Sequence, residues 1–180
     1  MSIYFLRHIK TVYNRDNIIS GIADAETLPG QALLYDPALP FFDCILCSPL
    51  LRCRETVKLL PQDLTSHIIY LDALKERDLG ILEGVKRSTA MYQYPDLFIN
   101  SKLNVSKPIP DAESIEDVQR RLRAEVLPLL RAHIHENILI CSHNQTLKIL
   151  YALLYGIEID NQFWHDTNFV NGKITALQKP

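Results

Sequence analysis

The sequence predicts an α/β fold, a three-layer α/β/α sandwich with a largely parallel central sheet. Short apolar runs rich in β-favouring residues recur along the chain, and segments with apolar residues at helical spacing separate most of them. Strands that alternate with helices are typical of a parallel sheet covered by helices. The length of 180 residues fits a single domain over residues 1–180.

The expected strands are short apolar runs bounded by polar or turn-forming residues. The first is the opening run Ile3–Leu6, which breaks abruptly into a cation and an imidazole. The others are Asp43–Cys47, His67–Leu71, Asn137–Cys141 and Gly172–Leu177. Runs of this length and composition are typical of buried strands.

The expected helices are Gln31–Tyr35, Leu51–Leu60, Glu113–His135 and Gln145–Tyr155. The longest has apolar residues at helical spacing from Ile115 to Leu130. Ser114, followed three residues later by Asp117, resembles a capping box at its start. Pro128 predicts a kink, because proline lacks the N–H that an interior helical turn uses.

The remaining segments are rich in polar, glycine or proline residues. Lys10–Gly30 is expected to be a long surface loop, and long loops in compact domains are often functional. Glu76–Gly84 contains two glycines and is also expected to be a loop. Tyr92–Pro110 has few periodic apolar residues and is expected to be an irregular flap over a site.

Composition excludes several classes of function. Apolar residues make up 47% of the chain and charged residues 22%, as in ordinary globular proteins. A net charge of −2 argues against a general nucleic-acid binder. No apolar run approaches the ~20 residues that a membrane span needs, and no secretory signal opens the chain. We therefore expect a cytoplasmic protein with reduced cysteines, and we leave its oligomeric state open.

Charged or titratable side chains follow several of the predicted strands. Arg7 and His8 end the first strand, Arg52 opens the helix after the second, Glu76 follows the third, and His143 ends the fourth. The carboxyl ends of parallel strands meet at one edge of a sheet, where ligands bind. Guanidinium groups suit phosphate oxygens, so the pattern favours a phosphoryl-transfer site.

These residues lie in segments that resemble the motifs of the histidine phosphatase superfamily, also called the phosphoglycerate mutase-like family. The segments, in the order in which that family carries its motifs, are LRHIKTVYN, CSPLLRCRET, LKERDLGILEG, DAES and CSHN. Ser20 and Gly21 lie in a further stretch that resembles the family pattern. The resemblance runs nearly from end to end of the chain.

The resemblance implies a catalytic set of His8, Glu76 and His143. His8 would attack phosphorus in line and become a phosphohistidine, so we expect a carbonyl or carboxylate on its other ring nitrogen. Glu76 would protonate the leaving alkoxide and then help water attack the phosphoenzyme. His143 would hold phosphoryl oxygens. No metal and no cofactor is implied.

The resemblance also implies a set of phosphate-binding residues, with a small phosphorylated molecule as the substrate. They are Arg7, Asn14, Ser20, Gly21, Arg52 and Asn144. Two positions depart from the family pattern, because Ile9 and Asn144 stand where the family has a glycine after each histidine. Either the backbone there is ordinary, or these loops differ from those of the family.

Several functions and assignments stay open. We expect a phosphomonoester phosphatase; a phosphoglycerate mutase, or a degenerate member that binds phosphorylated ligands without turnover, are the alternatives. Asp78 and Glu83 compete with Glu76 for the role of the acid, and Arg54 is expected at the surface. A zinc site on Cys44 and Cys47 is rejected, since residues three apart in a strand point to opposite faces.

Overall fold

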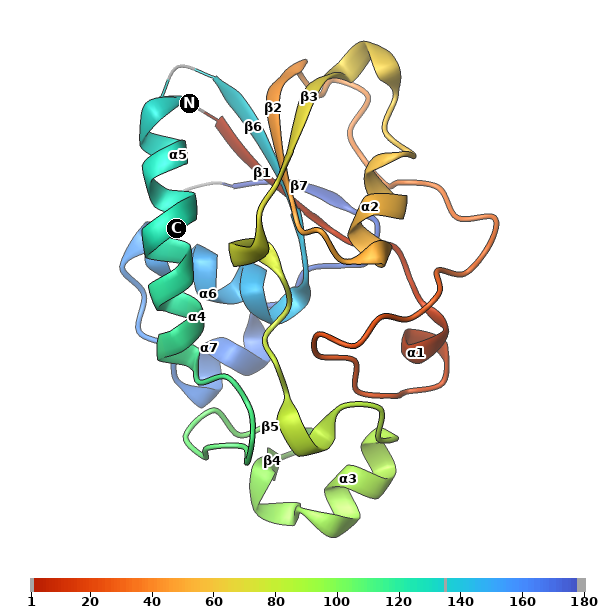
Figure 1. Ribbon diagram of the computed structural model, residues 1–180, viewed down its shortest axis with the longest axis vertical. Coiled ribbons are helices and arrows are strands. Elements are labelled where there is room, and N and C mark those ends of the chain that lie inside the picture. Colours follow the sequence, from red (N-terminus) through yellow and green to blue (C-terminus); the bar gives the residue numbers. More distant parts are fainter. Residues whose placement is uncertain (1, 135, 178–180) are drawn as a thin grey trace.

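The protein is described by a computed structural model that covers residues 2–134 and 136–177. Its sheet has the strand order β3-β2-β6-β1-β7 (Figure 1). The strands are β1 (Ser2–Arg7), β2 (Phe42–Cys47), β3 (Thr65–Tyr70), β6 (Asn137–Ser142) and β7 (Ile174–Ala176). The first four run parallel, whereas β7 runs antiparallel to β1. The expectation of a largely parallel sheet is confirmed.

The register of the sheet sets the position of the site. In the pairing of β1 with β6, Leu6 lies opposite Cys141 and Arg7 lies opposite Ser142. The His8 backbone N–H then donates to the Ser142 carbonyl at 3.0 Å. The residues that follow the two strands therefore leave the sheet side by side.

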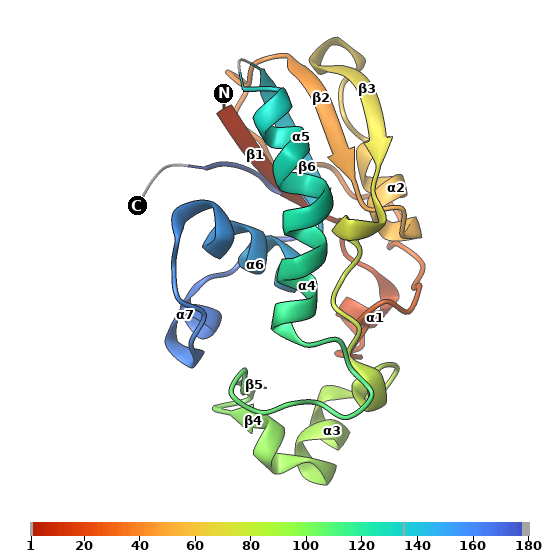
Figure 2. The ribbon, with the colours of Figure 1, turned by 60° about the vertical axis from the view of Figure 1, so that its left-hand side comes forward.

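Helices cover both faces of the sheet, which confirms the three layers (Figure 2). One face packs against α4 (Ile115–Arg121), a π-helical turn (Leu122–Val126), α5 (Leu127–Ala132), α6 (Asn144–Tyr155) and α7 (Asn161–Asp166). The other face packs against α2 (Leu51–Val57). Phe5 points to the first layer and Leu6 to the second, as the alternation of a strand requires.

A third, smaller hydrophobic cluster lies beyond the carboxyl ends of the parallel strands (Figure 1). It is built from 3₁₀ turns at Gly80–Leu82 and Pro95–Leu97, α3 (Arg87–Gln93), β4 (Phe98–Ile99) and β5 (Lys102–Leu103). Its buried members include Ile19, Leu82 and Leu103. We call residues 87–112 the cap. The expectation of an irregular flap is corrected, since this segment has its own secondary structure and core.

Further short elements complete the chain. They are α1 (Val12–Arg15) and two 3₁₀ turns, Gln62–Leu64 and Asp72–Leu74. Helix α1 lies within the segment predicted to be a loop. Within the described residues, no helix has the length and apolar character that crossing a membrane requires.

The predicted helix Gln31–Tyr35 is wrong. Leu34 forms a β-bridge with Lys173. The Leu34 N–H donates to the Gly172 carbonyl at 2.8 Å, and the Leu34 carbonyl accepts from the Ile174 N–H at 2.9 Å. Backbone partners more than a hundred residues away in the sequence thus hold this segment extended, and local propensity cannot reveal them.

The long helix begins with the predicted capping box and is interrupted as Pro128 suggested. The Ser114 hydroxyl accepts from the Asp117 N–H at 3.0 Å, and the Asp117 carboxylate accepts from the Ser114 N–H at 3.1 Å. A π-helical turn precedes Pro128, which has no N–H to donate to that turn. The helix ends at Ala132, and the predicted end at His135 lies outside the described residues.

Candidate active site

The carboxyl edge of the sheet encloses a cavity of about 130 Å³. All the predicted site residues line it except His143, which is fully buried. Those lining residues are Arg7, His8, Asn14, Ser20, Gly21, Arg52, Glu76 and Asn144. The parallel topology brings together those at the ends of β1 and β6, at the start of α2 and after β3, whereas Asn14, Ser20 and Gly21 come from α1 and the loop that follows it.

His8 is buried, and its ring has a defined tautomer. Its Nδ1 lies 2.6 Å from the Ile9 carbonyl oxygen, which can only accept, so Nδ1 carries the proton. Burial lowers the pKa of His8 well below its ordinary value, and the charges of Arg52 and Arg7 lower it further. The ring is therefore neutral at neutral pH, with a lone pair on Nε2.

Arg7 offers a buried donor at the same place. Its Nη1 donates to the Phe169 carbonyl at 2.9 Å. Its Nε is buried and has no hydrogen-bond partner within residues 2–134 and 136–177. Arg7 and His8 line the same cavity, and a guanidinium nitrogen without a protein partner can bind an oxyanion.

Arg52 links the cavity to the loop after α1. Its Nη1 donates to the Ala23 carbonyl at 2.8 Å and its Nη2 to the Gly21 carbonyl at 2.7 Å. Its Nε donates to Nδ1 of His143 at 3.1 Å. Only 1% of Arg52 is exposed, so its charge lies in the interior of the protein.

His143 lies behind His8 instead of lining the cavity. Because Nδ1 accepts from Arg52, the proton sits on Nε2, which lies 2.8 Å from the Ser48 hydroxyl oxygen. The His8 and His143 rings have centroids 5.2 Å apart. Burial lowers the pKa of His143 well below its ordinary value. Both ring nitrogens of His143 thus face protein groups.

Glu76 is the carboxylate that lines the cavity. Its Oε1 accepts from the backbone N–H groups of Arg77 and Thr146, both at 3.0 Å, and its Oε2 accepts from that of Gln145 at 3.3 Å. The last two are free N–H groups of the first turn of α6, so Glu76 also caps that helix. The competing Asp78 and Glu83 also accept from backbone N–H groups, but neither lines this cavity.

Glu83 instead holds the loop that carries Ser20 and Gly21. Its carboxylate accepts from Ile22 at 2.8 Å and from Leu79 at 2.9 Å. Gly21 has φ +53, and a Cβ there would lie 1.8 Å from Oε1 of Glu83. A side chain at this position would strain the backbone and would require the Glu83 carboxylate to move.

The two remaining predicted residues use their amide oxygens structurally. Oδ1 of Asn14 accepts from the Thr11 N–H at 3.0 Å within the capping box of α1. Oδ1 of Asn144 accepts from the Phe169 N–H at 3.1 Å. The amide nitrogen of Asn14 is the part of that side chain able to donate to a ligand.

The two departures from glycine have an ordinary backbone. Neither Ile9 nor Asn144 is among the non-glycine residues with positive φ. The Ile9 N–H donates to the Thr56 hydroxyl at 2.9 Å, and its side chain is buried. Asn144 opens α6. These positions therefore do not distort the loops that carry the two histidines.

A second cavity, of about 220 Å³, adjoins the first and was not predicted. The two share Arg87, Leu103, Asn144 and Gln145 as lining residues. Arg87, Lys102 and Lys148 give the second cavity a positive lining. Burial lowers the pKa of Lys148 to about 8. Helical spacing after His143 could have indicated Gln145 and Lys148; Arg87 and Lys102 belong to the cap, whose fold the sequence did not reveal.

The cysteines lie outside the cavity lining. Cys44 belongs to the cluster under α4–α6, whereas Cys47 belongs to the cluster under α2, as the strand alternation predicted. All four cysteines of the chain are buried free thiols. Within the described residues, no group of three His, Cys, Asp or Glu side chains could hold a metal ion.

The protein is thus of the α/β class, with a mostly parallel sheet whose carboxyl edge gathers buried imidazole, guanidinium and carboxylate side chains. The chain belongs to the histidine phosphatase superfamily, branch 1, whose family model matches residues 3–178.

Similar proteins include several phosphatases. A Hydrogenobacter thermophilus protein named "Putative phosphoserine phosphatase 2" is 28% identical over 97% of this chain and 88% of its own. The adenosylcobalamin/alpha-ribazole phosphatase of Escherichia coli is 27% identical over 92% of this chain and 84% of its own. The structure of a mycobacterial glucosyl-3-phosphoglycerate phosphatase superposes with a TM-score of 0.79 at 20% identity, covering 98% of this chain and 92% of the other.

Proposed function

We propose that this protein is a phosphatase that hydrolyses a phosphomonoester through a phosphohistidine on His8. The observation that carries this proposal is the state of the His8 ring. The Ile9 carbonyl holds the proton on Nδ1, so Nε2 keeps its lone pair, and Arg7, whose Nε is unpaired within the described residues, lines the same cavity. A buried neutral imidazole next to cations is a nucleophile suited to an anionic phosphoryl group.

The reaction takes place in two displacements. In the first, Nε2 of His8 forms a bond to phosphorus as the ester P–O bond breaks, and Glu76 gives a proton to the leaving alkoxide. In the second, a water molecule loses a proton to Glu76 and attacks phosphorus, and the P–N bond breaks to release phosphate. Arg7 stabilises charge on the equatorial oxygens. Arg52 supports this charge while it holds the Gly21 loop.

The test compares His8→Ala with a control histidine variant, His133→Ala. His133 lies at the end of α5 and pairs with Glu136. We expect p-nitrophenyl phosphate hydrolysis by His8→Ala to fall by about a thousandfold or more, as for loss of a covalent nucleophile, and His133→Ala to keep wild-type activity. An acid-labile phosphoenzyme should form in the wild type and in His133→Ala, and should not form in His8→Ala. Unchanged hydrolysis by His8→Ala would overturn the assignment.

The second cavity supports a substrate whose leaving group carries its own negative charge. Arg87, Lys102 and Lys148 line it, and it shares lining residues with the cavity of His8. Two of the similar proteins are named for phosphoserine and glucosyl-3-phosphoglycerate, which both carry a carboxylate. We therefore favour a phosphorylated carboxylic acid over a neutral phosphorylated alcohol.

A matched pair of substrates tests this preference. O-phosphoserine and O-phosphoethanolamine differ only in the carboxylate. We expect a kcat/KM about tenfold or more higher for O-phosphoserine, and Arg87→Gln should remove most of that difference, because one charge-assisted hydrogen bond contributes about this much. Equal kcat/KM for the two esters would contradict the preference and leave the phosphatase assignment unaffected.

The two alternative functions give different results in the same assays. Transfer between positions 3 and 2 of phosphoglycerate that depends on bisphosphoglycerate would indicate a mutase. Phosphate binding with no turnover by the wild type would indicate a binding protein. The ordinary backbone at Ile9 and Asn144 removes the structural reason to expect the second outcome.

A further inference from the structure

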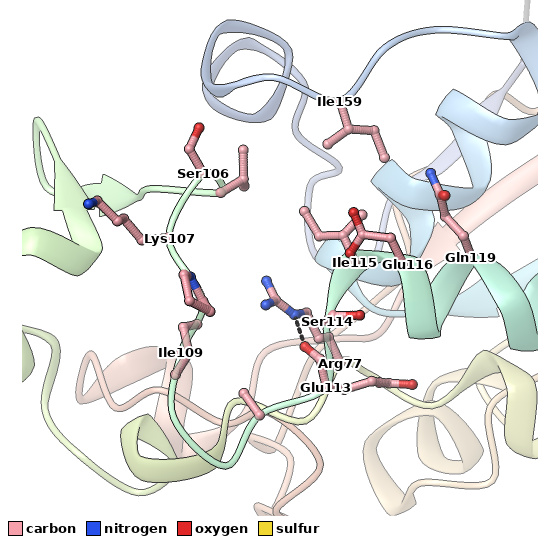
Figure 3. Close-up of a pocket in the computed structure, with 13 residues that line it drawn as sticks. Arg77, Ser106, Lys107, Ile109, Glu113, Ser114, Ile115, Glu116, Gln119 and Ile159 are labelled. Carbon is pink, nitrogen blue, oxygen red and sulfur yellow. Dashed lines mark hydrogen bonds between the residues drawn. The ribbon is translucent and has the colours of Figure 1, made fainter.

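A cavity of about 330 Å³ is lined by Arg77, the residue that directly follows Glu76 in the chain. Its wall is formed by the end of the cap, the start of α4 and residue Arg77 (Figure 3). Within the described residues, it shares no lining residue with the cavity of His8. It is therefore a separate place for a ligand.

Arg77 is the buried charge in this cavity. Only 5% of the residue is exposed. Its Nε donates to the Glu113 carbonyl at 2.6 Å, and Figure 3 shows the other two guanidinium nitrogens pointing into the cavity. Those two nitrogens form no hydrogen bond with the described part of the chain. Because a guanidinium nitrogen that faces a cavity can donate to a ligand, these two nitrogens are charged donors that the cavity offers to an acceptor.

Within the described residues, Arg77 forms no ion pair that would give its guanidinium group a structural role. The nearby Glu113 carboxylate pairs with Arg121, its Oε1 at 2.8 Å from Arg121 Nε and its Oε2 at 3.1 Å from Nη2. Glu116 lines the same cavity and attracts Arg77, but it forms no ion pair with it within the described residues. The two inward-facing nitrogens of Arg77 thus match the two oxygens of a carboxylate.

The rest of the wall limits the chemistry of the ligand. Apolar side chains supply much of it: Val105, Pro108, Ile109, Ile115 and Ile159. Besides Arg77, the charged lining residues are Lys107, Glu113 and Glu116, whose net charge of −1 disfavours a multiply charged anion such as a phosphate dianion. A singly charged carboxylate with an apolar body fits both the guanidinium and the hydrocarbon wall.

We propose that this cavity binds a small organic carboxylate with an apolar body through Arg77, and that its occupancy is coupled to Glu76. The Arg77 backbone N–H donates to Oε1 of Glu76 at 3.0 Å, so one residue contacts both the bound carboxylate and the proposed proton donor. The binding site stands apart from the proposed phosphatase function, whereas the coupling rests on it. A ligand bound to Arg77 can therefore change the rate of the proton transfer that we propose for Glu76.

The binding test titrates the whole chain with isovalerate, isovaleramide and inorganic phosphate, monitored by calorimetry and by backbone amide NMR shifts. We expect isovalerate to bind saturably and to move amide signals in residues 105–116. Isovaleramide, which lacks the charge, should bind at least about tenfold more weakly. Equal binding of the acid and its amide, or stronger binding of phosphate, would overturn the proposal.

Two variants and a control separate binding from folding. Arg77→Gln should weaken isovalerate binding about tenfold or more, and Arg120→Gln, an exposed arginine paired with Asp117, should leave it unchanged. Glu116→Gln changes an exposed side chain and should tighten binding about twofold to fivefold. If Glu116→Gln weakens binding, the proposal fails even when Arg77→Gln does not fold.

The coupling is read separately from kcat. Saturating isovalerate should change kcat for p-nitrophenyl phosphate by about twofold or more in the wild type and in Arg120→Gln, but not in Arg77→Gln. Binding with an unchanged kcat would overturn the coupling and keep the site. A chain without phosphatase activity would overturn the proposed function and leave the binding result to stand by itself.

Discussion

The two buried histidines have opposite tautomers, and a neighbouring group sets each one. In His8 the Ile9 carbonyl keeps the proton on Nδ1, whereas in His143 the Arg52 guanidinium keeps Nδ1 unprotonated. Burial next to arginine charges lowers the pKa of both rings. Neutral imidazoles persist in this environment at a pH where a solvent-exposed histidine is already charged.

These shifts predict an acid-sensitive fold. Below about pH 6.5 the unfolded chain binds protons at His8 and His143 that the folded chain refuses, so the free energy of unfolding falls as the pH is lowered. Each ring contributes up to about 1.4 kcal/mol per pH unit in this window, and the loss ends at the lowered folded-state pKa. Urea unfolding at pH 7.5, 6.5 and 5.5 measures it.

A single substitution isolates one ring. His8→Gln should reduce the slope of unfolding free energy against pH by up to about one proton, whereas His133→Gln, at the exposed end of α5, should keep most of it. If His8→Gln retained the full wild-type slope, the buried ring would not be the neutral species that the structure indicates.

The steric requirement at Gly21 predicts a large local cost of substitution. Gly21→Ala combines a positive φ with an overlap on the Glu83 carboxylate, whereas Gly30→Ala has a similar φ of +69 and open space around it. We expect about 1 kcal/mol of destabilisation at Gly30 and about 2–4 kcal/mol at Gly21. Thermal or urea unfolding measures both, and equal costs would show that Glu83 moves aside freely.

At the scale of secondary-structure elements, local signals predicted what local interactions determine. The strands around Phe5, Ile45 and Leu139 are apolar on both faces, so their composition was sufficient. The start of the helix at Ile115 was predicted from its capping box. Helix α3 and the extended segment at Leu34 could not be predicted, because contacts distant in the sequence set them.

The capping box of α4 gives a prediction at this scale. Ser114→Ala removes the hydroxyl that accepts from the Asp117 N–H, and we expect it to lower the free energy of unfolding by about 1 kcal/mol. Ser88→Ala serves as the control, since Ser88 is an exposed residue inside α3 and alanine favours a helix interior. An equal loss in both variants, measured by urea unfolding, would contradict the role of the cap.

For the whole molecule, the parallel topology explains why site residues could be predicted from strand ends. His8, Arg52 and Glu76 each follow or closely succeed a parallel strand, so one rule placed them at a common edge. That rule does not apply to Arg87, which reaches the cavity from the cap. The position of Arg87 depends on how the small cluster around Leu82 and Leu103 packs, and no periodic pattern in the sequence predicts that packing.

The same division of the core predicts unequal local stability. The sheet is buried between two helical layers, whereas the cap rests on a small cluster and two-residue strands. In native-state hydrogen exchange we expect amides of α3 and β5 to open at a free energy lower by about 1.4 kcal/mol or more than those of β1 and β6, a tenfold or larger difference in exchange. Equal protection would show that cap and sheet open as one unit.

The carboxylate of Glu76 caps the first turn of α6, so the side chain that we propose as the proton donor also stabilises the start of a helix. A substitution that changes the proposed proton transfer at this position therefore also changes the hydrogen bonds that cap α6. Drift here is confined to replacements that still accept from those backbone amides. A glutamine would keep the bonds from Arg77 and Thr146 through its amide oxygen, but it would set an NH₂ group against the Gln145 N–H and would remove the proposed proton transfer.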